Sequence, residues 1–241
     1  MKTRFFWTLV VVALSVTLIL ANIGTASPAL PVIAINPKVN SAVPTKTFTF
    51  NITISGVTLE NTKGFGICAW EVDISFNSTV LNVFSVKEGP WLKQAGTTYW
   101  IPPQIDNTAG TIVASASLFP IPVPPKTGAT GSGTLANITF TVLTRGVTPL
   151  HFYKTLLRAY NATSSSYLTI EHTVVDGYYQ YPLGDLDGDG YVGPIDLNKF
   201  AAAYGKRTGQ TGYNLWADLD KDDYIGPIDL NMFAANYGKR A

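Results

Sequence analysis

A repeat near the C-terminus constrains the fold of this chain most strongly. Segments 191–207 and 224–240 lie 33 residues apart and differ at only three of 17 positions. Each copy begins inside an acidic run that places aspartates at positions 1, 3, 5 and 12 of a twelve-residue loop. This is the EF-hand spacing, in which carboxylates and the position-7 carbonyl group surround one calcium ion. A merely solvated acidic loop would not repeat the same four positions, so the sequence predicts two calcium sites.

Four aspartates and one tyrosine carbonyl group are the predicted ligands of each ion. Position 6 of such a loop needs a left-handed backbone, which Gly190 adopts freely and Asp223 adopts at some cost. Lys221 adds a positive charge inside the second loop, which should oppose an incoming cation. The predicted first-site ligands are Asp185, Asp187, Asp189, Tyr191 and Asp196, and the second-site ligands are Asp218, Asp220, Asp222, Tyr224 and Asp229.

Each acidic loop is expected to lead into one short helix, over Pro194–Tyr204 and Pro227–Tyr237. Proline suits the first turn of a helix, and the glycines that follow both segments suit its C-terminal end. No helix is evident before either loop. The inward apolar side chains are expected to be Leu197 and Phe200 in the first helix, and Leu230 and Phe233 in the second.

A pair of loop-helix units with aspartate at position 12 resembles the dockerin family, over residues 183–241. The resemblance implies a calcium-folded α module that docks onto a cohesin domain. Many dockerins carry a Ser-Thr type pair at positions 10 and 11, where this chain has Pro-Ile in both copies, so recognition should be apolar. The residues expected to contact the partner are Pro194, Ile195, Asn198, Lys206, Arg207, Pro227, Ile228, Asn231, Lys239 and Arg240.

Residues 27–181 are predicted to form a β-sandwich or jelly roll, which makes the whole chain mainly β. Apolar and polar residues alternate over Phe48–Ile54, Cys68–Phe76 and Ala136–Val142, as in half-buried strands, and turn signals separate these runs. The proline-rich segment Phe119–Gly133 is interpreted as a long surface loop. Strand patterns end near Val175 and the first acidic loop starts at Asp185, so the two modules should pack side by side.

The order of the strand patterns between residues 30 and 180 resembles a cohesin jelly roll. The similar features include 48–52, 66–76, 79–83 with Gly89-Pro90-Trp91-Leu92, 105–112 and 131–140. With the dockerin-like segment 182–241, containing repeats 185–207 and 218–240, this implies a non-catalytic scaffold or adaptor for calcium-dependent cohesin–dockerin assembly. Its partners would be cohesin- or dockerin-bearing extracellular proteins, in a setting linked to polysaccharide binding or breakdown.

The sequence is compatible with two other function classes. The cohesin fold is shared with some carbohydrate-binding modules, so the chain could instead bind polysaccharide through exposed aromatic residues and use a dockerin anchor; Trp91, Tyr99, Trp100 and Phe119 are the candidates. A glycosidase needs two facing carboxylates. Glu71 and Asp73 share one face of a predicted strand, but that face is more simply its solvated side.

Charge and cysteine content exclude several other functions. The formal net charge is +1 with no basic cluster, which argues against a nucleic-acid partner. Cys68 is the one cysteine, so the chain can form no internal disulfide and no zinc site made of several cysteines. Its apolar neighbours indicate a small buried side chain rather than a reactive thiol.

The N-terminus predicts export. Two basic residues precede an apolar run from Phe5 to Ala21, and small residues follow up to Ala26, which indicates a signal peptide over residues 1–26. An uncleaved membrane anchor is the alternative, and either would place the protein outside the cell or on its surface. Four Asn-x-Thr sequons are candidate glycosylation sites, at Asn51, Asn77, Asn137 and Asn161.

Overall fold

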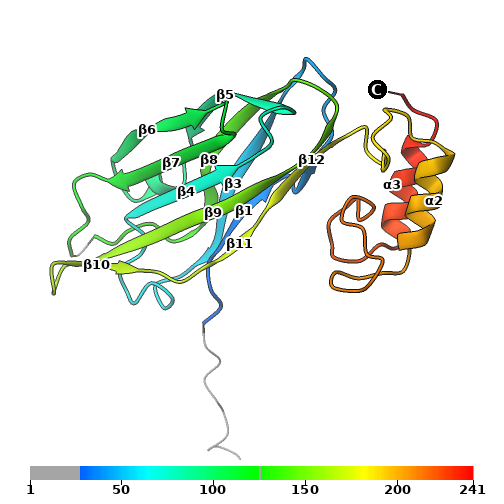
Figure 1. Cartoon of the computed structure of the whole chain (residues 1–241). Helices are drawn as coiled ribbons and strands as arrows, with labels where there is room; N and C mark the ends of the chain where they lie inside the picture. Colours follow the sequence, from blue (N-terminus) through cyan, green and yellow to red (C-terminus); the bar gives the residue numbers. More distant parts are fainter. Residues whose placement is uncertain (1–27, 125, 241) are drawn as a thin grey trace, which may run out of the picture.

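The computed structural model describes residues 28–124 and 126–240. The predicted signal peptide therefore lies outside the described residues. Two modules follow one another along the chain, a β-sandwich and a tail with two short helices (Figure 1). Among the described residues no helix has the length and apolar character needed to span a membrane.

The sandwich consists of a five-stranded and a seven-stranded sheet packed face to face. The five-stranded sheet has the order β11-β1-β3-β8-β5, and the seven-stranded sheet has the order β2-β12-β9-β4-β7-β6, with β10 paired to β9. The strands are β1 (Val32–Asn36), β2 (Val39–Asn40), β3 (Thr47–Val57), β4 (Ala69–Ser75), β5 (Leu81–Glu88), β6 (Thr98–Asp106), β7 (Thr111–Leu118), β8 (Gly131–Val142), β9 (Gly146–Asn161), β10 (Ser166–Thr169), β11 (Thr173–Val175) and β12 (Gly177–Tyr181).

The period-two patterns are confirmed as strands with one buried face. In β3, Phe48, Phe50, Ile52 and Ile54 all point into the core. Cys68 is buried in the same core, as predicted, and burial raises the pKa of its thiol to about 11. The core is built from the inward residues of both sheets, as the alternation requires.

The proline-rich segment is irregular only up to Thr130, because β8 already begins at Gly131. It is also not free on the surface, since Ala129 is buried and forms a β-bridge with Ile67. Close packing also constrains the third residue of this strand. A Cβ atom at Gly133 would lie 2.7 Å from Cδ1 of the buried Trp91, so only glycine fits there.

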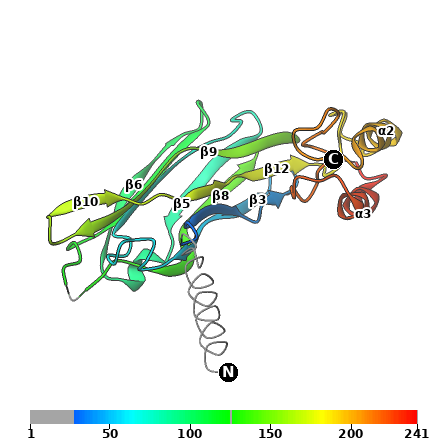
Figure 2. The ribbon, with the colours of Figure 1, turned by 90° about the horizontal axis from the view of Figure 1, so that it is seen from below.

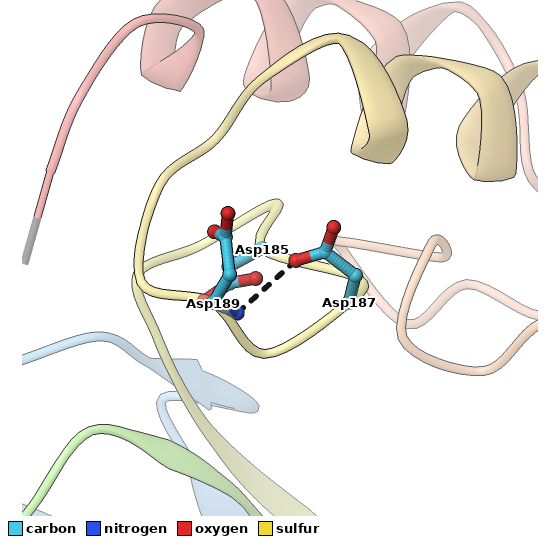
Figure 3. Close-up of side chains that lie close together, drawn as sticks. All are labelled: Asp185, Asp187 and Asp189. Atoms are coloured by element: carbon cyan, nitrogen blue, oxygen red, sulfur yellow. Dashed lines mark hydrogen bonds between the residues drawn. The ribbon is translucent and has the colours of Figure 1, made fainter.

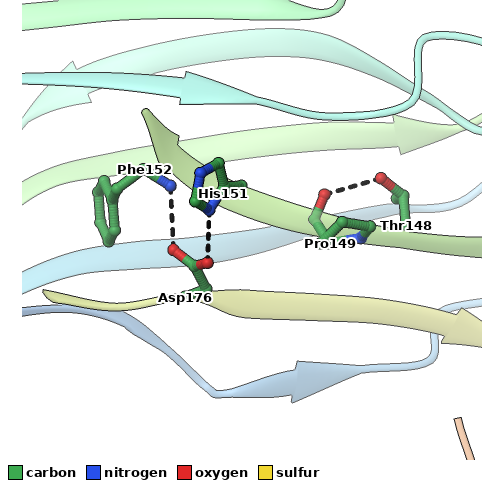
Figure 4. A network of polar contacts seen from close by, with 5 residues as sticks. All are labelled: Thr148, Pro149, His151, Phe152 and Asp176. Atoms are coloured by element: carbon green, nitrogen blue, oxygen red, sulfur yellow. Dashed lines mark hydrogen bonds and ion pairs between the residues drawn. The ribbon is translucent and has the colours of Figure 1, made fainter. Parts of the chain in front are cut away.

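The chain crosses from the five-stranded to the seven-stranded sheet at Asp176, between β11 and β12. Its carboxylate accepts a hydrogen bond from the backbone N–H of Phe152 at 3.0 Å. Its other oxygen lies 2.7 Å from Nδ1 of His151 (Figure 4). Both partners belong to β9, so this network holds the crossover against the neighbouring strand and places β12 where the tail begins.

The tail has its own small core around two helices, α2 (Pro194–Ala203) and α3 (Pro227–Asn236). Both agree with the predicted helices to within a residue, and Phe200 stacks on Phe233 with ring centroids 5.0 Å apart. The prediction that Leu197 and Leu230 face inward is wrong, because both are 41% exposed. They lie about 60° around the helix from the stacked phenylalanines, outside the stripe that the two helices share.

The two modules pack against each other, as the short connection predicts. Figures 1 and 2 show the tail at one end of the sandwich, beyond β12, with its two helices side by side. The connecting contacts include Gln180 Nε2, which donates to the Trp216 carbonyl oxygen at 3.4 Å, and the edge-to-face rings of Tyr178 and Trp216. This position leaves the broad faces of the sandwich uncovered.

Candidate functional site

The first acidic loop brings three carboxylates together (Figure 3). One oxygen each of Asp185, Asp187 and Asp189 lies within 4.8 Å of the others. The loop holds this shape through its own backbone. Asp185 accepts hydrogen bonds from the N–H groups of Gly188 at 2.7 Å and Gly190 at 2.9 Å. The predicted ligands at positions 1, 3 and 5 therefore converge.

The second acidic loop repeats this arrangement. Asp218, Asp220 and Asp222 also bring one oxygen each within 4.8 Å of one another. Asp218 accepts hydrogen bonds from the backbone N–H groups of Asp222 at 3.1 Å and Asp223 at 3.0 Å. The hydroxyl of Tyr213 adds a third bond to Asp218 at 2.6 Å, a partner that the sequence analysis did not identify.

The position-12 aspartates organise the loops from inside. Asp196 accepts the backbone N–H groups of Leu186 and Asp187 on one oxygen, and that of Gly193 on the other. Asp229 makes the three equivalent bonds in the second loop. Both are 1% exposed and lie outside the two three-carboxylate groups. Their role as direct ligands stays a prediction, as does that of the Tyr191 and Tyr224 carbonyl groups.

The donor set fits a hard divalent cation. Burial raises the pKa of Asp185, and the nearby carboxylates of Asp196 and Asp187 raise it further. Burial likewise raises the pKa of Asp220, together with the charge of Asp229. A bound cation favours the ionised form of a carboxylate whose pKa is raised by burial and by neighbouring negative charges. Oxygen-only donors on a tightly turned loop are what calcium prefers.

The backbone at position 6 is left-handed in both loops, as predicted. Gly190 has a φ of 83° and Asp223 has a φ of 71°. Asp223 is held there by Thr208, whose hydroxyl donates to Oδ1 of Asp223 at 2.8 Å. The ammonium group of Lys221 donates to the carbonyl oxygens of Leu215 and Asp218. Its expected opposition to an incoming cation stays a prediction.

We expect Asp223→Gly to tighten calcium binding at the second site by up to about 1 kcal/mol, because glycine removes left-handed strain from a loop that must fold to bind. Titration calorimetry measures this. The Thr208→Val variant is the control, since it removes the hydrogen bond and keeps the strain. Weaker calcium binding by Asp223→Gly would show that the carboxylate helps more than its strain hurts.

The two repeats pack around a pseudo-twofold axis. Tyr191 forms a β-bridge with Arg240, and Arg207 forms the equivalent bridge with Tyr224. Each arginine also lies over the ring of its tyrosine, with Cζ 4.4 Å and 4.3 Å from the ring centroids. The predicted partner contacts thus occupy matched positions, and Ile195 and Ile228 are each 58% exposed. The exposed Leu197 and Leu230 extend this apolar surface, which the sequence analysis missed.

The outer face of the seven-stranded sheet carries a second candidate surface, formed by β6, β7, β4, β9 and β10. We call it the outer sheet face. A shallow pocket of about 410 Å³ lies on it. Tyr99, Tyr153 and Tyr167 are exposed around it. The pocket lining includes Glu71, Ile101, Ser115, Leu156, Arg158 and Tyr167.

Glu71 and Asp73 share this face, as the alternation in β4 predicts, but the interpretation of both as solvated is wrong for Asp73. Asp73 is only 6% exposed. Lys154 lies opposite it on β9, and the pairing of β4 with β9 shifts register directly after Asp73. Lys154 Nζ lies 2.5 Å from Glu71 and 3.8 Å from Asp73. Within the described part of the chain, Oδ1 of Asp73 is buried without a hydrogen-bond partner.

The aromatic candidates for sugar binding do not form one platform. Trp91 is fully buried, and its indole N–H donates to the Thr130 carbonyl oxygen at 3.2 Å. Trp100 packs against Trp70 with centroids 5.9 Å apart, whereas Tyr99 and Phe119 are exposed. Adjacent residues of a strand point to opposite faces, so Tyr99 and Trp100 cannot share a platform. The scatter favours protein docking over sugar binding.

The four sequons occupy two kinds of position. Asn51 and Asn137 lie opposite each other on β3 and β8, where a glycan on one would cover the other. Asn77 and Asn161 stabilise turns, accepting the backbone N–H groups of Thr79 at 3.0 Å and Thr163 at 2.9 Å. Glycosylation at all four stays a prediction.

Comparison with known proteins identifies the sandwich. The family model of the cohesin domain matches residues 33–177. No curated protein matches the chain. Similar solved structures include a non-cellulosomal cohesin from the archaeon Archaeoglobus fulgidus, 14% identical, covering 63% of this chain and 90% of that one, with a TM-score of 0.46.

Two further similar solved structures are also cohesins. The sixth cohesin of scaffoldin B from Acetivibrio cellulolyticus, solved with a dockerin, is 12% identical and covers 63% of this chain and 99% of that one, with a TM-score of 0.49. The seventh type I cohesin of ScaB from Pseudobacteroides cellulosolvens is 16% identical and covers 63% of this chain and 92% of that one, with a TM-score of 0.47.

Proposed function

Because this chain belongs to the cohesin domain family, we propose that it is a scaffold or adaptor whose function is assembly through two docking modules. Cohesin domains are non-catalytic modules that bind dockerin-bearing partners. The family match over residues 33–177 carries this proposal. In the proposed arrangement the sandwich receives a dockerin-bearing partner, and the tail is itself a dockerin that docks onto another cohesin.

The outer sheet face is the proposed docking surface of the sandwich. It combines exposed tyrosines, a shallow pocket and a few charged groups, which is the composition of protein interfaces. The tail packs at the end of the sandwich beyond β12, so it leaves this face accessible (Figure 2). The opposite sheet presents a row of uncharged threonines and asparagines on β3 and β8, including Thr49, Asn51 and Asn137.

Calcium is the proposed cofactor of the tail, with one ion in each acidic loop. The three-carboxylate groups of Asp185 and Asp218 and their neighbours would hold the ions. Calcium would supply the positive charge that offsets the like charges gathered in each loop. The predicted signal segment supports an extracellular location, free or attached to the cell surface. We propose that the assembly works in polysaccharide binding or breakdown, and we assign no polysaccharide-binding site to this chain.

A capture experiment tests the docking surface. We expect the immobilised chain to retain a dockerin-bearing protein from the secreted proteins of its source, and Ile101→Asp to abolish this retention by placing a charge beside the pocket. The matched control is Thr49→Asp, an exposed position on the opposite sheet. Equal retention by the two variants would rule out the outer sheet face as the docking surface.

Asp73 should reduce stability at neutral pH. Burial raises its pKa, Lys154 lowers it and Glu71 raises it again, with a net rise. A raised folded-state pKa favours the fold below the unfolded pKa of about 3.9, and this contribution is lost as the pH rises through the folded pKa. A carboxylate that lowers the stability of the fold at neutral pH is a candidate for a functional role, here in partner binding.

We therefore expect Asp73→Asn to stabilise the sandwich by roughly 1 kcal/mol at pH 7, with the gain vanishing in acid, and to weaken partner docking. Thermal unfolding at both pH values measures the stability. Asp106→Asn is a control with the opposite expected sign, because backbone hydrogen bonds from Ala109 and Thr108 lower the pKa of Asp106. This variant should lose stability at pH 7. Destabilisation by Asp73→Asn at pH 7 would show that the Lys154 ion pair outweighs the burial.

A further inference from the structure

The two acidic loops differ at their fourth position, where Lys221 stands in the place of Gly188. Gly188 has open space around it, whereas Lys221 is 2% exposed. The Lys221 ammonium group donates to the carbonyl oxygens of Leu215 at 2.5 Å and Asp218 at 2.6 Å. Lys221 also has a left-handed φ of 60°. A buried lysine in a left-handed conformation is costly on both counts, so its surroundings must hold it there.

Those surroundings come from the sandwich as well as from the tail. The Lys221 ammonium lies 5.2 Å from the ring centroid of Tyr178 in β12 and 5.0 Å from that of Trp216 in the tail. Both rings are within cation–π range. The backbone carbonyl of Lys221 accepts a hydrogen bond from Lys38, which follows β1. Gln180 in β12 bonds the Trp216 carbonyl oxygen beside it. Lys221 is therefore the centre of the contact between the modules.

The first loop touches the sandwich more lightly. Arg145 Nη1 donates to the Asp189 carbonyl oxygen at 3.4 Å, and the guanidinium occupies the space where a Cβ of Gly190 would lie. Both acidic loops thus face the same end of the sandwich. Only the second inserts a buried side chain into the contact.

We propose that Lys221 couples calcium binding in the second loop to docking of the tail on the sandwich, so that calcium turns two flexibly joined modules into one rigid unit. The inference rests on the calcium function proposed above. Lys221 stands between Asp220 and Asp222, and the backbone N–H of Asp222 bonds the carboxylates of Asp218 and Asp220. The loop conformation that gathers the carboxylates is therefore the one that aims Lys221 at Tyr178. Coupling of this kind is reciprocal.

Distances between spin labels in the full-length chain test the proposal. Labels at Thr49→Cys in the sandwich and Ala235→Cys in the tail occupy exposed positions. The buried Cys68 stays unlabelled, because its thiol is inaccessible. With calcium we expect one narrow distance distribution, and with EGTA a broad one. Lys221→Gly, which copies the first loop, should stay broad in calcium, and so should Tyr178→Leu, which leaves the tail sequence intact.

The matched control is Lys199→Ala. Lys199 Nζ also donates to a loop carbonyl oxygen, that of Leu186 at 2.8 Å, but on the exposed side of the tail. This variant should keep the narrow distribution in calcium. A narrow distribution for Lys221→Gly and Tyr178→Leu in calcium, or for the parent chain in EGTA, would overturn the coupling.

Calorimetric calcium titration of the same proteins distinguishes a failure of the coupling from a failure of calcium binding. Calcium binding with unchanged distances in the variants would overturn the coupling alone. Failure of the parent chain to bind calcium would overturn the proposed calcium function itself.

Discussion

Removal of calcium is expected to unfold the tail and leave the sandwich folded. Residues 184–241 contain nine aspartates and six basic residues, a net charge of −3, and six of the aspartates gather in two groups. The seven fully buried residues of the tail core have little apolar surface to offset this repulsion. An ion that binds only the folded tail contributes roughly 2.7 kcal/mol per site at 100 times its dissociation constant.

Circular dichroism and limited trypsin digestion of the full-length chain measure this effect. In excess EDTA the helical signal of α2 and α3 should disappear, and trypsin should cleave at Lys199 and Lys206 while the sandwich resists. Calcium should reverse both changes. A variant with Asp185→Asn and Asp218→Asn serves as the control, because it should be unfolded in the tail with or without calcium. Helical signal that persists in EDTA would contradict the prediction.

The second large effect is expected from a pair of substitutions on the two helices. Ile195→Asp or Ile228→Asp alone should cost little partner affinity, because the pseudo-twofold arrangement presents the same apolar patch twice. The double variant should lose at least about 30-fold, the effect of removing a binding hot spot. Folding should survive, because both residues lie in the first turn of a helix, where an acidic side chain is favourable.

Kinetic binding measurements with a captured cohesin-bearing partner decide the outcome. Thr211→Asp is the control for added charge, since it is exposed in the segment between the repeats. Loss of binding in either single variant would mean that the partner uses one helix only. The similarity of the repeats would then reflect a duplication of the sequence rather than two equivalent docking orientations.

The most reliable sequence predictions were those in which spacing alone fixes the geometry. Period-two alternation identified β3, β4 and β8, and the acidic spacing identified loops whose carboxylates do converge. The left-handed φ of Asp223 followed from its loop position in the same way. In each case neighbours in the chain impose the local structure, so no distant contact was needed to predict it.

The sequence by itself therefore determined the strands, the two acidic loops and the helices that follow them. Only the tertiary structure decided what covers each side chain. Trp91 is buried because Gly133 admits it to the core, and Asp73 is covered because Lys154 lies beside it on β9. Leu197 is exposed because the two helices meet along another stripe. Lys221 reaches Tyr178 across the junction of the modules. Each of these side-chain environments depends on residues that are distant in the chain. No local sequence pattern predicts that such residues come together.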